Sequence, residues 1–149
     1  MVIFTPRVKD LMERKVVFID SAATVTDAIK KMVQENTWSI VVEKHGLPIG
    51  VVITEDIFTR CLAKGLDPDK IAVGDIESSP IITIGPDATV EETAKLMISN
   101  DIRRIFVVED GKIVGRITQK ILFESSFNVM ETLVGKVLWQ KKPLDSVDS

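Results

Sequence analysis

The residues able to carry out covalent or metal chemistry are few in this sequence. Among its 149 residues, His45 is the only histidine and Cys61 the only cysteine. One histidine in a turn does not make a Ser-His-Asp set, and a zinc centre needs several such ligands. The sequence also lacks a Gly-rich phosphate loop of the Walker type and a dinucleotide fingerprint. We therefore predict a protein that is not an enzyme and holds neither a metal nor a resident cofactor.

Two adjacent arginines are the charged feature with the clearest binding chemistry. Arg103 and Arg104 stand at the start of a predicted strand, where paired guanidinium groups are suited to holding a phosphate. Ordinary solvated charges are the alternative interpretation. The whole chain carries a formal net charge of −3, which gives no general attraction to nucleic acid. A local patch of Arg103, Arg104 and Arg116 keeps nucleic-acid binding open as an alternative.

The elements that must position these residues occur twice. Residues 8–58 align with residues 73–123 without a gap, and many apolar positions stay in step. Within this alignment Ala23-Thr24-Val25 falls on Ala88-Thr89-Val90. The in-register match predicts two copies of one structural unit.

Each copy predicts a strand, a helix, two strands joined by a turn, and a second helix. Short β-branched runs predict the strands, and apolar residues at helical spacing after Thr24 and Thr89 predict the first helix of each copy. Asp110-Gly111 is typical of a hairpin turn. We expect strands at 16–19, 39–43, 49–53, 81–84, 104–109 and 113–118, and helices at 25–33, 54–64, 90–98 and after 118.

The predicted fold class is therefore α/β (α+β), with two tandem β-α-β-β-α repeats. One unit of this size has too little core to be stable alone, so the copies are expected to pack sheet to sheet around a pseudo-twofold axis. The predicted domains are repeat one at 1–65, a linker at 66–72, repeat two at 73–126, and a helical extension and tail at 127–149.

The segment after the second repeat carries an apolar stripe at helical spacing. It could continue the core or contact a second subunit, and both alternatives stay open. No stretch approaches the roughly 20 apolar residues of a membrane span, and the N-terminus lacks the apolar run of a signal peptide. A soluble, cytoplasmic protein is expected. The stripe consists of Phe127, Met130, Leu133, Val134, Val137 and Leu138.

Together these features resemble the CBS (cystathionine β-synthase) domain family, in particular its stand-alone tandem pairs. Three stretches carry the resemblance: Val-Lys-Asp-Leu-Met at 8–12, Asp-Ala-Thr-Val-Glu-Glu-Thr-Ala-Lys-Leu-Met at 87–97, and Asp-Ile-Arg-Arg-Ile-Phe-Val-Val-Glu-Asp-Gly-Lys-Ile-Val-Gly-Arg-Ile-Thr at 101–118. The resemblance implies a Bateman module, a disc-shaped regulatory pair that often forms homodimers. Its expected ligands are AMP, ADP, ATP or S-adenosylmethionine, and its expected protein partner is a separate effector.

The resemblance also implies roles for particular residues. A carboxylate would accept hydrogen bonds from ribose hydroxyls, basic residues would hold phosphate, and the backbone of the first strand would contact the base. Here Ile53 takes the usual Thr/Ser position, Thr54 stands one place late, and Ile121 replaces the second carboxylate. The ligand-binding residues that the resemblance implies are Asp56, Arg103, Arg104, Ile81, Ile82, Val51, Thr54, Lys120 and Thr118.

Because the two copies have lost different parts of this motif, we predict one competent cleft and one degenerate cleft. Asp56, Arg103 and Arg104 would form the first. The second would contain Ile121, Trp38 and Ser39 beside 16–17. Ordinary structural roles remain the alternative: for Asp56, a carboxylate favoured by the dipole of a helix N-terminus; for Thr54 and Thr118, helix capping; for Lys120, a surface charge; for Trp38, packing. At the level of the whole protein, the alternatives are a structural dimerisation module without a ligand and a nucleic-acid-binding module.

Overall fold

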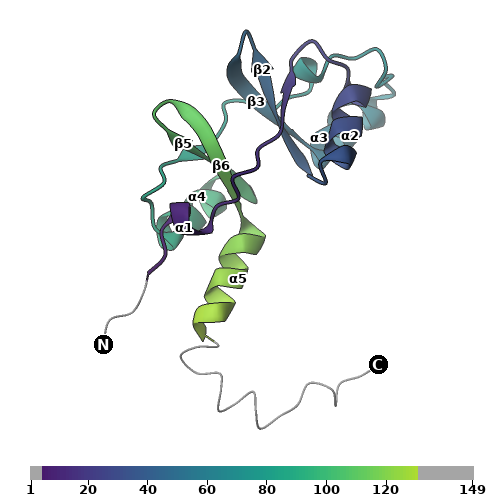
Figure 1. Ribbon diagram of the computed structural model, residues 1–149. Helices are drawn as coiled ribbons and strands as arrows, with labels where there is room; N and C mark the ends of the chain where they lie inside the picture. The colour runs from purple at the N-terminus through teal and green to yellow at the C-terminus, as the bar shows by residue number, and fades with distance from the viewer. Residues whose placement is uncertain (1–4, 131–149) are drawn as a thin grey trace, which may run out of the picture.

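The computed structural model describes residues 5–130. Both repeats have the predicted order of elements, and they form two lobes that lie side by side in Figure 1. The first repeat contains α1 (Val8–Leu11), β1 (Phe18–Asp20), α2 (Val25–Gln34), β2 (Ser39–Lys44), β3 (Leu47–Ile53), α3 (Thr54–Arg60) and a 3-10 turn, Leu62–Lys64. The second contains a 3-10 turn, Val73–Asp75, then β4 (Thr83–Ile84), α4 (Val90–Asn100), β5 (Arg104–Glu109), β6 (Lys112–Thr118) and α5 (Gln119–Met130).

The two sheets have the same topology. In each, the first strand is parallel to the second and the second is antiparallel to the third, in the orders β1-β2-β3 and β4-β5-β6. The register shifts at Val42/Glu43 in one hairpin and at Val107/Val108 in the other, which are equivalent positions. The predicted α/β fold of two tandem repeats is confirmed.

Local sequence signals explain most element boundaries. The Thr24 hydroxyl accepts from the Asp27 N–H at 3.1 Å, and the Asp27 carboxylate accepts from the Thr24 N–H at 3.2 Å, which is the predicted capping box. His45 and Gly46 both have positive φ, as a tight two-residue hairpin turn requires. The first strand of each repeat is shorter than predicted, so Ile81 and Ile82 precede β4.

The repeats exchange their leading segments. Val8 is fully buried in the core of the second repeat, and its N–H donates to the Ala88 carbonyl at 2.9 Å. The equivalent Val73 is fully buried in the core of the first repeat, and its N–H donates to the Ala23 carbonyl at 2.7 Å. Each core is therefore completed by residues that precede the other repeat's sheet.

The predicted linker at 66–72 is part of the packed first repeat. The Thr26 N–H donates to the Pro68 carbonyl at 3.1 Å, and the Val25 N–H donates to the Ile71 carbonyl at 2.9 Å. This stretch therefore packs along the start of α2 and does not span the repeats as a free connector. The units of packing and the units of sequence repetition have different boundaries.

Helix α5 extends past the second lobe in Figure 1. Phe123 and Phe127 on this helix are exposed. The rest of the predicted stripe, from Leu133 onward, lies outside the described residues. Within residues 5–130 no helix is both long and apolar enough to cross a membrane.

Candidate functional site

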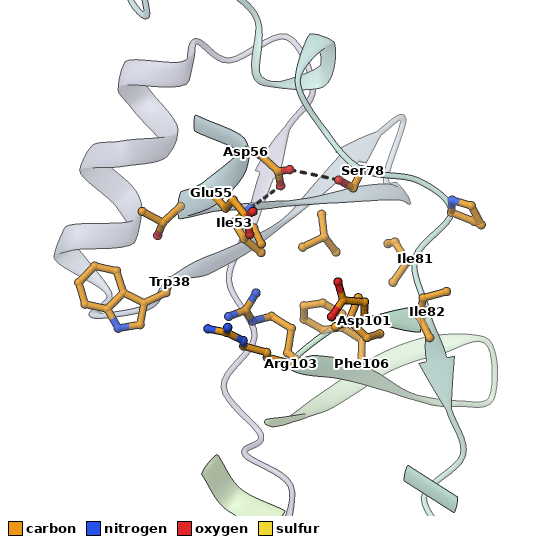
Figure 2. Close-up of a pocket in the computed structure, with 15 residues that line it drawn as sticks. Trp38, Ile53, Glu55, Asp56, Ser78, Ile81, Ile82, Asp101, Arg103 and Phe106 are labelled. Carbon is orange, nitrogen blue, oxygen red and sulfur yellow. Dashed lines mark hydrogen bonds between the residues drawn. The ribbon is translucent and has the colours of Figure 1, made fainter. Parts of the chain in front are cut away.

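A cleft of about 530 Å³ lies between the two repeats. Its first-repeat side is formed by the end of β3, the first turn of α3 and Trp38. Its second-repeat side is formed by the segment before β4 and by the residues that lead into β5. Figure 2 shows the two sides facing each other, with Asp56 and Ser78 at one end and Arg103 and Phe106 opposite.

The structure brings most of the predicted site residues into this cleft. Lys120 and Thr118 do not line it. Lys120 is exposed on α5 with its Nζ 3.9 Å from a Glu124 carboxylate oxygen, and the Thr118 hydroxyl accepts from the Ile121 N–H at 3.2 Å. Lys120 is therefore a surface charge and Thr118 a helix cap, as in the alternative interpretation, because α5 starts away from the cleft. The predicted residues that do line the cleft are Val51, Thr54, Asp56, Ile81, Ile82, Arg103 and Arg104.

Asp56 links the two sides of the cleft. Its carboxylate accepts from the Ile53 N–H at 2.9 Å, which caps α3, and from the Ser78 hydroxyl at 3.3 Å (Figure 2). The Arg60 Nε lies 3.6 Å away. The side chain is only 10% exposed. A carboxylate has about four acceptor positions, so these partners leave room for a ligand hydroxyl.

Thr54 does not cap α3, contrary to expectation, because Ile53 precedes the helix and Asp56 caps it. Thr54 is the first helical residue, and its hydroxyl oxygen is buried without a hydrogen-bond partner among residues 5–130. Buried hydroxyls nearly always have a partner. The Thr54 hydroxyl therefore has unused hydrogen-bonding capacity at the wall of the cleft.

Arg104 is half-buried, and Arg103 beside it is exposed. Within the described part of the chain, neither guanidinium has an ion pair or a hydrogen bond. Burial lowers the pKa of Arg104, and the charges of Arg116 and Arg103 lower it further, against a smaller raising effect of the Asp56 carboxylate. Two like charges therefore face the cleft without a counter-ion, an arrangement that an anion would stabilise.

The opposite side of the molecule has a different arrangement at the equivalent positions. The Glu13 and Arg116 backbones pair there, as the Ser78 and Val51 backbones pair at the open cleft. The Arg116 guanidinium donates to the Thr37 hydroxyl at 2.7 Å and to the Ser39 hydroxyl at 3.1 Å, and lies 2.9 Å from the Glu13 carboxylate. Its side chain is 18% exposed. The Arg116 side chain thus bridges the two repeats on this side. At the open cleft the equivalent residue is Val51, whose shorter side chain leaves that space open.

Two expectations about this opposite side and one interpretation of Arg116 need correction. Trp38 lines the open cleft instead, because the Thr54 N–H donates to the Trp38 carbonyl and holds residue 38 beside α3. Ile121 packs against the core of the second repeat. Arg116 was considered part of a basic surface patch, yet its guanidinium is paired and mostly buried. Ser39 does lie on the opposite side, as expected.

Sequence reasoning missed Glu55, Ser78 and Asp101, which also line the open cleft. One signal for Asp101 was available. It aligns with Asn36, and both residues adopt a left-handed backbone conformation, with φ of 51° and 52°. Asn and Asp are the non-glycine residues that most readily accept that conformation, so the position marks the turn that delivers Arg103 to the cleft.

The model of the CBS domain matches residues 8–63 and 73–127 of this chain. The chain belongs to the CBS domain family. CBS domain pairs of this stand-alone kind are generally regulatory, ligand-sensing modules.

Relatives of this CBS pair occur in archaea and bacteria. It is 31% identical to an uncharacterized protein of Methanocaldococcus jannaschii over 142 residues, which cover 93% of this chain and 76% of that protein. It is 30% identical to a CBS domain-containing protein of Bacillus subtilis over 108 residues, or 72% of this chain and 76% of the relative.

Solved structures have the same fold as this CBS pair. An uncharacterized conserved protein from Pyrococcus horikoshii superposes with a TM-score of 0.76 at 28% identity, covering 84% of this chain and 95% of that one. A hexameric CBS-CP12 protein from bloom-forming cyanobacteria gives a TM-score of 0.76 at 30% identity, covering 84% of this chain and 75% of that one.

A partly buried carboxylate, Glu77, directly precedes the cleft residue Ser78. Glu77 occupies the position of Met12 in the other repeat, and a Cβ atom at Gly50 would collide with its carboxylate. One Glu77 carboxylate oxygen is buried without a hydrogen-bond partner among residues 5–130. Burial raises the pKa of Glu77, against the lowering effects of the Arg60 charge and of a hydrogen bond with the Ser79 side chain.

Glu77→Met, which copies Met12, is expected to stabilise the protein at pH 7 by about 1 kcal/mol, because it removes a partly buried charge that has one oxygen without a hydrogen-bond partner among residues 5–130. A carboxyl whose pKa is raised by folding stabilises the native state below its unfolded pKa and loses that contribution as pH rises through the folded pKa. The gain measured by urea unfolding should therefore be large at pH 7 and small at pH 4. An equal gain at both pH values would contradict the assignment.

Proposed function

We propose that this CBS pair is a non-enzymatic regulatory module that binds an adenosyl ligand, such as AMP, ADP, ATP or S-adenosylmethionine, in the open cleft. The carrying observation is the half-buried Arg104 beside Arg103, both without a counter-ion among the described residues. In this proposal the arginine pair holds the phosphate of a nucleotide. The ligand state is then reported to a separate effector protein.

The remaining cleft residues support the same assignment. Thr54 and Asp56 both line the cleft, and the Asp56 carboxylate has acceptor positions left for ribose hydroxyls. Ile81 and Ile82, together with Phe106, provide an apolar surface for a base. The volume of about 530 Å³ is within the range of small-molecule sites.

One ligand per chain is proposed because Arg116 fills the space opposite. At that position, Ser39 stands where the open cleft has Arg104, and Thr37 stands where it has Ile102. Both hydroxyls accept hydrogen bonds from Arg116. A ligand entering there would have to displace a guanidinium from three partners.

Isothermal titration tests the proposal directly. AMP, ATP and S-adenosylmethionine are titrated separately into the full chain, and we expect binding of at least one with a stoichiometry of one per chain. At 100 times its dissociation constant, that ligand should stabilise the protein by about 2.7 kcal/mol. Two equal sites per chain would contradict the single cleft. No binding of any of them would favour the alternative of a structural module, and salt-sensitive binding of an oligonucleotide would favour a nucleic-acid module.

We also propose that the pair forms a homodimer through its helices. Val33 and Ile98 occupy equivalent positions on α2 and α4 and are 72% and 80% exposed. Phe58 and Phe123, equivalent on α3 and α5, are exposed as well. Exposed apolar side chains at equivalent positions of the two repeats suit a second copy, which can cover both sets in one closed symmetric interface.

Ile98→Glu is expected to shift the chain from dimer to monomer, because a charge at the centre of an apolar interface loses its hydration. Light scattering after gel filtration measures the mass. Lys112→Glu, at the distant β5–β6 hairpin, is the control and should leave the dimer intact. A wild-type chain that is monomeric at high micromolar concentration would exclude this interface.

A further inference from the structure

The open cleft contains carboxylates as well as arginines. Glu55, Asp56 and Asp101 line it together with Arg103 and Arg104. Asp56 is neutralised within the protein by the Ile53 N–H, the Ser78 hydroxyl and the nearby Arg60.

Glu55 and Asp101 differ from Asp56 in their exposure. Both are exposed at the opening of the cleft, and neither has an ion pair or a side-chain hydrogen bond within residues 5–130. Figure 2 shows Glu55 on the first-repeat side and Asp101 on the second-repeat side, which also carries Arg103. Unpaired negative charges therefore lie on both sides of the opening.

This arrangement limits the negative charge that a bound ligand can carry. Two guanidinium groups balance the two negative charges of a single phosphate group. Each further phosphate adds charge that the arginine pair cannot balance, and that charge has to lie near the opening, where Glu55 and Asp101 repel it. The repulsion between like charges a few ångströms apart at a protein surface is large enough to change affinity by about tenfold.

We propose that the cleft selects ligands with one phosphate group and discriminates against di- and triphosphates when no divalent cation accompanies them. This inference rests on the proposed function, since it specifies the ligand of the same cleft. The expected order of affinity is AMP, then ADP, then ATP, with adenosine also weaker than AMP because it leaves both guanidinium groups without a counter-ion. A divalent cation bound to ATP should narrow the difference, because it neutralises the outer phosphates.

The experiment is isothermal titration of adenosine, AMP, ADP and ATP into the full chain in a buffer with a metal chelator. The wild-type protein should bind AMP about tenfold more tightly than ATP. In the double variant Glu55→Gln, Asp101→Asn, the shapes are kept and the charges removed, so the difference should shrink to about threefold or less through tighter ATP binding. Asn is well tolerated at residue 101, where φ is 51°.

The matched control is the double variant Glu109→Gln, Asp110→Asn. It changes the net charge equally, and Asp110 has the same left-handed conformation with φ of 52°, but both residues lie at the β5–β6 hairpin and do not line the cleft. It should keep the wild-type preference for AMP. Equal binding of ATP and AMP by the wild-type protein, or an unchanged difference in the cleft variant, would overturn this inference while leaving the adenosyl site intact. Absence of binding by every adenine compound would instead overturn the proposed function, and the inference with it.

Discussion

Arg104→Met is expected to weaken binding of AMP by about 10- to 100-fold while making the ligand-free protein more stable. Hydrogen bonds to a charged group contribute about 1.5–3 kcal/mol each, and each 1.4 kcal/mol is a factor of ten in affinity. Without ligand, the same guanidinium is half-buried, has no counter-ion among the described residues, and is close enough to Arg103 and Arg116 for their charges to lower its pKa. Methionine keeps the aliphatic stem and removes the charge, so a gain of about 1 kcal/mol is expected.

Both effects of Arg104→Met are measurable on one protein preparation, by titration calorimetry and by urea unfolding without ligand. Arg104→Lys serves as the control, since it keeps a positive charge. It should bind AMP more tightly than Arg104→Met does and should show no gain in stability over the wild-type protein. Arg103→Met should have the smaller effect on stability, because Arg103 is exposed. Unchanged affinity in Arg104→Met would remove the main support for the proposed phosphate position.

Arg116→Val is expected to destabilise the protein by about 2–3 kcal/mol and to leave ligand affinity within threefold of wild type. The substitution copies Val51 at the equivalent position. It removes hydrogen bonds to Thr37 and Ser39 and leaves the Glu13 carboxylate without its ion-pair partner. Loss of one member of a largely buried polar network costs more than the average surface contact.

The double variant Glu13→Ser, Arg116→Val tests the cause of that loss. Serine copies Ser78, so both residues then match the open cleft. Part of the lost stability should return, because no unpaired carboxylate remains. A stability change below about 0.5 kcal/mol in the single variant would show that the Arg116 contacts do not hold the repeats together.

The repeated elements could be predicted because their signals are local. The capping box at Thr24 and Asp27 and the turn at Asp110-Gly111 depend on neighbours within a few residues, and the structure has both. The helix after β3 was placed correctly, but its cap was assigned to Thr54 instead of Asp56, since both residues suit a helix N-terminus.

The candidate site was predictable only where family resemblance named the residues. Asp56, Arg103 and Arg104 come together as that resemblance implied, although ligand binding by them stays a prediction. Trp38 was placed on the wrong side, because alignment of the repeats gives equivalence between positions and not proximity in space. The role of Arg116 depends on Glu13, Thr37 and Ser39, which come from distant parts of the chain, and no local pattern connects them.

Exchange of Val8 and Val73 between the two cores has a consequence for how such a chain could originate. A single repeat on its own would have an incomplete core, because the leading segment of the other repeat would be missing. Its own leading segment would have no core to pack into. Two identical single-repeat chains could complete each other's cores by exchanging these segments. An unduplicated ancestor of this protein would therefore have been an obligate dimer, and gene duplication would have joined two partners that already depended on one another for folding.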